Sequence, residues 1–424
     1  MSTPDSAATT TPAKPPAFMR PGIGLMRRIS MKAKLLGIAS VLVVPLIFAM
    51  VSLTQHLLDD IRIAEAELDG VSAVEALTDV VLHIQTHRGL TNRVLSGDEA
   101  AKAPRDATRQ KLKEALSTVD AVSRDKPQLA LGKQWPAQRQ AIEALTADSN
   151  SEPRPKQFAA HSAQVSQLID MVDYVGETSG LLFDPMPATY FLMDVMVSRT
   201  LPWVEAMGVL RGSGAGLLAR GDASSVEIAS ALGLLHDIQS LTHGIDQRMQ
   251  SLQRQGEAPP AAWTDTQTQV NAYIAAGQKA FGEGRPVGEA PAFFDAGTQT
   301  IGAAIKFQKI VSQRMSVLLN ERKQALVTQI TLLAIVSTLG AFLLVYALVS
   351  FGMATLGSLS TLGRSMKQAA EGNLASIIHV DGNDEMAHMG RAFEEMLTSL
   401  SALVAEVRSA AALVGDVGNL LVTD

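Results

Sequence analysis

Two long stretches without a charged side chain constrain this chain more than any other feature. Residues 35–54 and residues 330–351 are both apolar and uncharged. A helix needs about 20 such residues to cross roughly 30 Å of hydrocarbon. Every backbone N–H and C=O group in lipid must also find a partner inside the protein, which favours helices. The sequence therefore predicts an all-α membrane protein with two transmembrane helices, at 35–54 and 330–351.

Other interpretations of these stretches stay open. Residues 35–54 follow a basic flank, as the apolar core of a signal peptide does, but the run is long for such a core and no small-x-small cleavage site follows it. Residues 330–351 could instead form a buried core helix. Pro45 would kink a helix in water, whereas a neighbouring helix in the membrane can satisfy the carbonyl that it frees.

The distribution of charge predicts the orientation of the spans. Residues 1–34 contain six Lys or Arg residues and one Asp, and begin with a Ser/Thr/Pro/Ala-rich run that is typical of a disordered tail. Positive charge beside the first span favours a cytoplasmic N-terminus. Residues 55–325 then face the periplasm, and the chain beyond the second span is again cytoplasmic.

Composition excludes several classes of function. The chain has no cysteine, which rules out disulfides, thiolate metal sites and thiol catalysis. Its net charge of −6 lacks the basic footprint that nucleic-acid binding requires. No glycine-rich phosphate loop or other catalytic motif occurs, so we expect no enzyme activity and no cofactor.

The segment at 55–325 is rich in helix-forming residues with apolar positions every three or four residues. We expect an extended helical-bundle sensor domain of six to eight helices, as two stacked bundles or one long bundle with added helices. The first and last of these helices should continue from the spans. Breaks are predicted near residues 103–104, 151–153, 184–187, 259–260 and 284–286.

A repeated Arg-Gly pair provides the candidate binding site. Arg88-Gly89 and Arg211-Gly212 each precede a Gly-Asp pair of the kind that ends a helix. Glycine costs about 1 kcal/mol inside a helix, so close packing should compensate for it. We hypothesise an anion site formed by Arg88 and Arg211, with Arg93 and Arg199 as further members. The alternative is that the arginines form structural ion pairs with Glu75, Asp194 or Glu205.

Other side chains near these arginines are weaker candidates. His87 and Tyr190 are included as ligand contacts, although Tyr190, Met193 and Trp203 also fit an ordinary core. The histidines at 83, 87, 236 and 243 lack a carboxylate at metal-binding spacing, so no metal site is predicted.

The cytoplasmic segment contains a long apolar seam. Positions separated by three and four residues are apolar at Met386, Met389, Phe393, Met396, Leu400, Leu403, Val407, Ala410 and Val414. Such a pattern directly after a membrane span predicts a parallel coiled coil between subunits, and hence a homodimer.

These residues resemble the HAMP domain, a parallel four-helix signal converter of membrane receptors. The resemblance rests on Gly372-Asn373-Leu374 at the end of the first helix, Asp384-Glu385-Met386 at the start of the second, and the Phe393 to Met396 step. It implies a HAMP domain at 355–407, with Leu374 and Gly382 packing the connector on the bundle. Ser358 stands where the family usually has proline. Residues 408–424 would begin a signalling coiled coil.

The whole layout resembles the methyl-accepting chemotaxis proteins, which implies an inner-membrane receptor with both termini in the cytoplasm. Gln85-Thr86-His87-Arg88-Gly89-Leu90 is similar to a segment of helical sensor domains of the nitrate- and nitrite-sensing type, where paired arginines hold the anion. The ligand would be a small molecule, an anion or a solute-binding protein. Receptor arrays are a further implied assembly.

The long signalling hairpin of that family, which contacts a histidine kinase and an adaptor, is missing from these 424 residues. Both a truncated chain and a naturally short protein fit this. A sensor histidine kinase or a diguanylate cyclase cut at its linker is one alternative. A structural membrane-anchored helical protein without a ligand is another.

Overall fold

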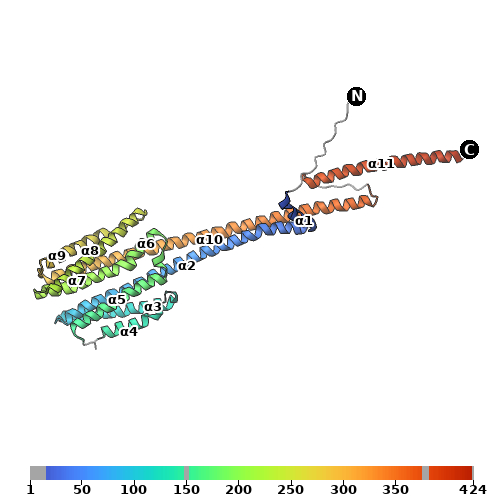
Figure 1. Ribbon diagram of the computed structural model, residues 1–424. Helices are drawn as coiled ribbons and strands as arrows, with labels where there is room; N and C mark the ends of the chain where they lie inside the picture. Colours follow the sequence, from blue (N-terminus) through green and yellow to red (C-terminus); the bar gives the residue numbers. More distant parts are fainter. Residues whose placement is uncertain (1–15, 148–151, 375–381, 423–424) are drawn as a thin grey trace, which may run out of the picture. The chain divides into compact units, whose positions relative to one another are not determined.

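A computed structural model describes residues 16–147, 152–374 and 382–422. All regular structure among these residues is helical (Figure 1). The chain divides into two compact units, which are His56–Ile330 and the combination of Met1–Gln55 with Thr331–Asp424. The membrane-span candidates lie in the second of these units and the arginine motifs in the first.

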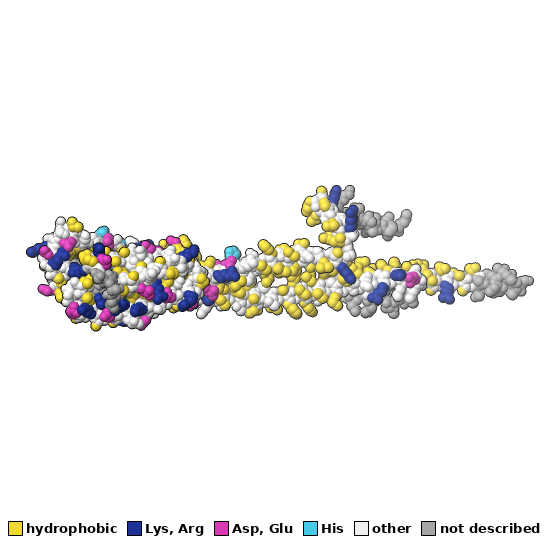
Figure 2. Space-filling model, turned by 90° about the horizontal axis from the view of Figure 1, so that it is seen from below, with side chains coloured by type: hydrophobic (Ala, Val, Ile, Leu, Met, Phe, Trp, Pro, Cys, Tyr) yellow, Lys and Arg dark blue, Asp and Glu magenta, His cyan; other side chains and the backbone are white. Residues whose placement is uncertain are grey.

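Two very long helices contain the predicted spans. Helix α2 runs from Met31 to Val94 and α10 from Ala290 to Ala370, and each holds an 18-residue window of mean hydropathy 2.5 with no buried residue. Figure 2 shows hydrophobic side chains covering these windows, while charged side chains gather over the unit His56–Ile330. The chain is an all-α membrane protein, as predicted.

A third helix is also long and apolar enough to cross a membrane, by length and composition alone. Helix α11 extends from Glu385 to Val422, and its candidate window within Glu385–Val414 has a lower mean hydropathy of 1.4. The same stretch of α11 carries the apolar seam predicted from sequence, which raises its mean hydropathy.

The N-terminal segment differs in part from the predicted disordered tail. Residues 1–15 lie outside the described residues, but Arg20–Arg28 form helix α1. Pro21 stands in its first turn, where a missing N–H costs nothing, and Arg27 and Arg28 lie in its last turn, where cations favour the helix dipole. The Ser/Thr/Pro/Ala-rich run ends before this helix begins.

The unit His56–Ile330 consists of two bundles that lie side by side (Figure 1). One contains α2 with α3, α4 and α5, and the other contains α7, α8 and α9 with α10. Hydrophobic residues of both bundles form one continuous core. The remaining helix bounds are Lys102–Asp125 for α3, Trp135–Thr146 for α4, Arg154–Thr178 for α5, Pro187–Met193 for α6, Thr200–Arg220 for α7, Ser225–Arg254 for α8 and Ala262–Phe281 for α9.

The predicted breaks near 184–187, 259–260 and 284–286 fall where helices end or begin, whereas the connection between α3 and α4 at 126–134 was not predicted. Pro104 lies in the first turn of α3, and the chain turns earlier, after α2. A π-helical turn over Asp194–Arg199 joins α6 to α7, and Pro202 lies in the first turn of α7. In that turn the Thr200 hydroxyl donates to the Val195 carbonyl at 2.7 Å. Gly221 ends α7 with a φ of 73°, as its Gly-Asp signal predicted.

A buried group of charges connects α2, α10 and the turn before α6. Arg322 donates to Glu67 at 2.6 Å and to Asp184 at 3.1 Å. One oxygen of each carboxylate is buried without a partner among the described residues. Burial, reinforced by the charge of Asp184, raises the pKa of Glu67 from 4.5 to about 7 despite the opposing effect of Arg322. Two carboxylates thus share one guanidinium in a low-dielectric site.

Glu67 should make the stability of the protein depend on pH. Because its folded pKa lies above its unfolded pKa, its contribution is complete below about pH 4.5 and is lost as pH rises through about 7. The raised pKa corresponds to at most about 3 kcal/mol. Thermal unfolding of the full chain in nanodiscs at pH 5 and pH 8 should show a smaller difference for Glu67→Gln than for the wild type.

Glu65→Gln is the matched control, since Glu65 is half-exposed and, among the described residues, pairs only with Lys323 at the surface. Its pH dependence should equal that of the wild type. Equal pH dependence of the wild type and Glu67→Gln would contradict the assignment of the raised pKa to Glu67.

Candidate functional site: an arginine-lined pocket

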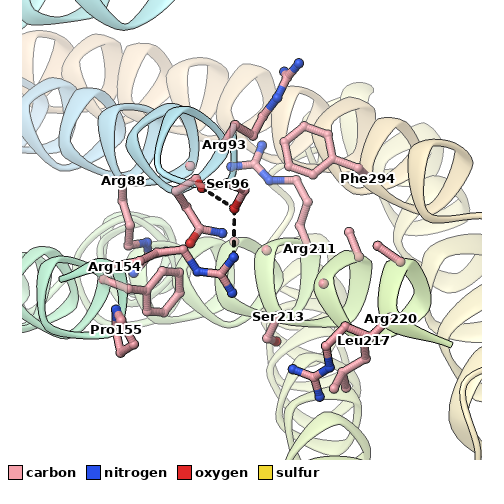
Figure 3. Close-up of a pocket in the computed structure, with 18 of the residues that line it drawn as sticks. Arg88, Arg93, Ser96, Arg154, Pro155, Arg211, Ser213, Leu217, Arg220 and Phe294 are labelled. Carbon is pink, nitrogen blue, oxygen red and sulfur yellow. Dashed lines mark hydrogen bonds between the residues drawn. The ribbon is translucent and has the colours of Figure 1, made fainter. Parts of the chain in front are cut away.

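A cavity of about 700 Å³ lies where the two bundles of the unit His56–Ile330 meet (Figure 3). Its wall comes from α2, α5, α7, α8 and α10, and from the turn after α2. We call it the arginine pocket, because five arginines line it: Arg88, Arg93, Arg154, Arg211 and Arg220.

Arg88 is held entirely by protein groups. Its Nη1 and Nη2 atoms donate to the two carboxylate oxygens of Glu205, at 2.6 and 3.1 Å, and Nη1 also donates to the Ser162 hydroxyl at 2.7 Å. Gln85 donates to the same carboxylate at 2.7 Å. The guanidinium lies over the ring of Phe158, 4.9 Å from its centroid. Arg88 therefore forms the ion pair with Glu205 that the sequence analysis gave as the alternative to an anion site.

Arg211 does not use all of its hydrogen-bond donors on protein groups. Its Nη1 donates to the Thr298 hydroxyl at 3.2 Å, whereas its Nε is buried without a partner among the described residues. The guanidinium stacks over Phe294 at 5.0 Å. Burial lowers the pKa of Arg211, yet a guanidinium remains charged in proteins. Arg211 therefore presents a partly desolvated cation.

The other three arginines differ in their partners. Arg93 pairs with Asp98 at 2.5 Å, and Arg220 pairs with Glu227 at 2.6 Å. Arg154 donates to the Ser96 hydroxyl at 2.7 Å and has no carboxylate partner among the described residues. Figure 3 shows Arg154 and Arg211 on either side of Ser96.

Glycines let α2 and α7 approach each other at the arginines. A Cβ on Gly208 of α7 would lie 3.3 Å from Nη2 of Arg88, and a Cβ on Gly89 of α2 would lie 3.7 Å from Nη2 of Arg211. Each guanidinium thus lies over a glycine of the opposite helix. Gly212 instead faces Phe158 at 3.6 Å. The tight approach is at Gly208, which the Arg-Gly pattern did not include.

The structure does not bring Arg199 into the pocket. Arg199 lies on the π-helical turn and donates to Asp194 at 2.6 Å, and Arg248 donates to the same oxygen at 2.5 Å. A Cβ on Gly244 would lie within 2.4 Å of an Arg199 nitrogen, so the glycine leaves room for this guanidinium. Tyr190 is on α6 and also lies outside the pocket wall, exposed and in edge contact with Phe191.

His87 is a buried structural residue and not part of the pocket wall. Its Nδ1 lies 2.9 Å from Nε2 of His161, and the two rings stack. His161 Nδ1 lies 2.7 Å from the Gln157 carbonyl and must donate to it, so Nε2 of His161 accepts from His87. Burial lowers the pKa of His87 to about 3 and that of His161 to about 4, which keeps both neutral. The pair joins α2 to α5.

The described residues contain no cluster of three or more His, Asp or Glu side chains suited to a metal ion. The charged and aromatic pocket residues Arg154, Phe158, Arg220 and Phe294 are among those that were not identified from sequence. Arg220 directly precedes the Gly221-Asp222 pair, and that position was its one signal in the sequence. The other three come from α5 and α10, far away in sequence.

The second candidate region begins at the end of α10. Gly372 has a φ of 92° after this helix, and the Asp384 carboxylate accepts the Ala387 N–H at 2.9 Å, which caps α11 at Glu385. Leu374 packs on a small core of Leu362, Phe393 and Leu397. Met386 is half-buried and Met396 is exposed. The connector residues 375–381 lie outside the described residues.

Comparison with known proteins matches residues 351–402 to the HAMP domain model. The chain thus contains a HAMP domain close to the predicted 355–407, and a HAMP domain on a membrane-spanning chain indicates transmembrane signal transduction. The match overlaps the apolar window of α11, which the HAMP seam accounts for.

The fold also resembles a solved structure, that of the NasR transcription antiterminator. The TM-score is 0.50 at 17% sequence identity, and the alignment covers 87% of this chain and 99% of the other. At this identity the similarity concerns the fold alone. No curated protein matches the sequence.

Removing Arg88 should destabilise the protein, because it leaves the Glu205 carboxylate partly buried without its cation. We expect Arg88→Ala to cost about 3 kcal/mol. The double variant Arg88→Met with Glu205→Met should recover most of this loss. Thermal unfolding of the full chain in nanodiscs measures both. An Arg88→Ala variant as stable as the wild type would contradict a structural role for the pair.

Proposed function

We propose that this protein is a chemotaxis transducer of the bacterial inner membrane that senses a small anion in the arginine pocket. The observation that carries the proposal is Arg211. Arg211 lines the cavity with a half-buried guanidinium that has no carboxylate partner among the described residues, and a bound oxyanion or carboxylate would supply that partner. In this proposal Arg88 holds the helices of the pocket wall together, since it donates to Ser162 of α5 and Glu205 of α7.

Signal transfer in this proposal uses the two long helices. Arg88 and Arg93 are on α2 and Phe294 is on α10, and each of these helices also contains a membrane-span candidate. α10 continues to Ala370, inside the HAMP match. A ligand that prefers one packing of the bundles would shift the equilibrium by its differential affinity, and the helices would pass a small movement to HAMP.

A chemotaxis output is favoured over an enzymatic one by α11, whose apolar seam continues past the HAMP match without a break. A sensor histidine kinase or a diguanylate cyclase is the alternative output, and no enzyme activity is proposed for these residues. A deletion strain distinguishes the outputs. Loss of chemotaxis toward the bound anion supports a transducer, and a changed cyclic-dinucleotide level or lost gene regulation supports an enzyme.

Anion binding should depend on Arg211. Isothermal titration calorimetry on the full chain in nanodiscs, with nitrate, acetate and malonate as probes, should detect at least one binder. We expect Arg211→Gln to weaken its binding by at least about tenfold, because a charge-assisted hydrogen bond is lost.

Arg285→Gln is the matched control, since Arg285 is exposed and does not line the pocket. Its affinity should equal that of the wild type. Absence of binding for all three anions, or unchanged binding in Arg211→Gln, would contradict the site and favour a receptor that reads a solute-binding protein.

We also propose a homodimer formed through the seam of α11. Met389, Met396, Leu400, Leu403 and Val407 are all at least 40% exposed in the single chain. Such a stripe at three- and four-residue spacing matches the a and d positions of a coiled coil, and a second copy would bury it.

Replacing a seam residue by a charge should therefore disrupt the dimer. Leu403→Glu should shift the full chain in detergent from dimer to monomer in light scattering coupled to size-exclusion chromatography. Ser399→Glu, on the same helix but off the seam, is the control and should stay dimeric. A wild-type chain that is monomeric at micromolar concentration would contradict the seam as an interface.

A further inference from the structure

The arginines of the arginine pocket are not all paired with carboxylates. Three of its five arginines have a carboxylate partner, which is Glu205 for Arg88, Asp98 for Arg93 and Glu227 for Arg220. Arg154 and Arg211 donate only to the hydroxyls of Ser96 and Thr298 among the described residues. Arg220 has a second carboxylate, Asp222, at 3.6 Å. Arg154 and Arg211 are therefore the two pocket arginines without a carboxylate partner among the described residues, and a ligand could supply one to each.

The size of the pocket excludes a close fit to a simple inorganic anion. A water molecule occupies about 30 Å³ of liquid volume, and a small oxyanion is of that order. The pocket measures about 700 Å³, which lies in the range of about 300–1,000 Å³ typical of sites for organic ligands. A small inorganic anion could meet one guanidinium and would leave most of this space to water.

The pocket wall has apolar surface between the charges. The rings of Phe158 and Phe294 line it, together with Leu217, Val226 and several alanines. The guanidinium carbon of Arg211 lies over the Phe294 ring, 5.0 Å from its centroid, so a positive charge and an apolar surface are adjacent in the wall. This combination suits a molecule with acidic groups on a hydrocarbon or aromatic body.

The two uncompensated arginines come from different bundles. Arg154 stands at the start of α5 in one bundle, and Arg211 is on α7 in the other. Figure 3 shows them on either side of Ser96, with the pocket residues around them. A ligand that meets both would connect the bundles across the cavity.

We infer that the ligand is an organic dianion whose two carboxylates engage Arg154 and Arg211 while its body lies on the apolar wall. The inference rests on the proposed anion-sensing function and names the class of ligand for that same pocket. Such a ligand neutralises both free charges, fills the cavity better than an inorganic ion, and stabilises one spacing of α5 and α7.

The test compares dianions with matched monoanions on the full chain in nanodiscs. Calorimetric titrations use malonate, succinate, glutarate, adipate and phthalate, each beside a monocarboxylate of the same skeleton, and nitrate. At least one dicarboxylate should bind at least about tenfold more tightly than its monocarboxylate, since it engages a second guanidinium.

Variants connect that preference to the two arginines. In Arg154→Gln, and separately in Arg211→Gln, the best dicarboxylate and its monocarboxylate should bind with equal affinity. Arg154→Lys should retain part of the preference for the dicarboxylate, because lysine keeps the positive charge but cannot donate two parallel hydrogen bonds to one carboxylate. Arg154 is exposed and donates only to the Ser96 hydroxyl among the described residues, so its variants should keep the thermal midpoint of the wild type.

The outcomes separate the inference from the function on which it rests. Nitrate or a monocarboxylate binding as tightly as every dicarboxylate, with loss in Arg211→Gln, would overturn the dianion and leave the anion sensor standing. Failure of all these probes to bind would overturn both. A dicarboxylate preference that survives Arg154→Gln would overturn the role of Arg154.

Discussion

A helix cannot end inside the hydrocarbon of a bilayer, because its last carbonyls would lack hydrogen-bond partners there. Helices α2 and α10 satisfy this requirement by continuing without interruption into the unit His56–Ile330. Within that unit they pair directly, for example through Gln308, which donates to Thr78 at 3.1 Å. The shorter helices pack on this pair, so the positions of both bundles depend on it.

Charge determines the character of the site within that frame. Most buried charges of this unit have partners, as the Arg88 and Glu205 pair shows, since an isolated buried ion costs several kcal/mol. Arg211 departs from that rule beside a large cavity, and so do the buried oxygens of Glu67 and Asp184. Arg211 lines the arginine pocket and is the basis of the proposed ligand site. The unpartnered oxygens of Glu67 and Asp184 are buried away from the arginine pocket, and we expect them to affect stability.

Neutral polar contacts connect the bundle helices around the site without adding charge. The His87 and His161 rings form a hydrogen-bonded stack between α2 and α5, and burial keeps both uncharged at neutral pH. Trp203 of α7 donates to Thr242 of α8 at 2.9 Å. These contacts join neighbouring helices of the bundles through neutral groups.

The sequence by itself determined the helical class, the span candidates, the HAMP domain and the Arg88 and Arg211 pairing of motifs, because hydropathy, periodicity and short motifs are local properties. For Arg88 it allowed two roles, as part of an anion site or as a member of a structural ion pair. Only the tertiary structure decided that Arg88 is held by Glu205 while Arg211 stays open, and that Arg199 and His87 lie elsewhere. It also added Arg154 and Phe294. Those outcomes depend on which helices become neighbours, and residues far apart in the chain carry no local signal of their contacts.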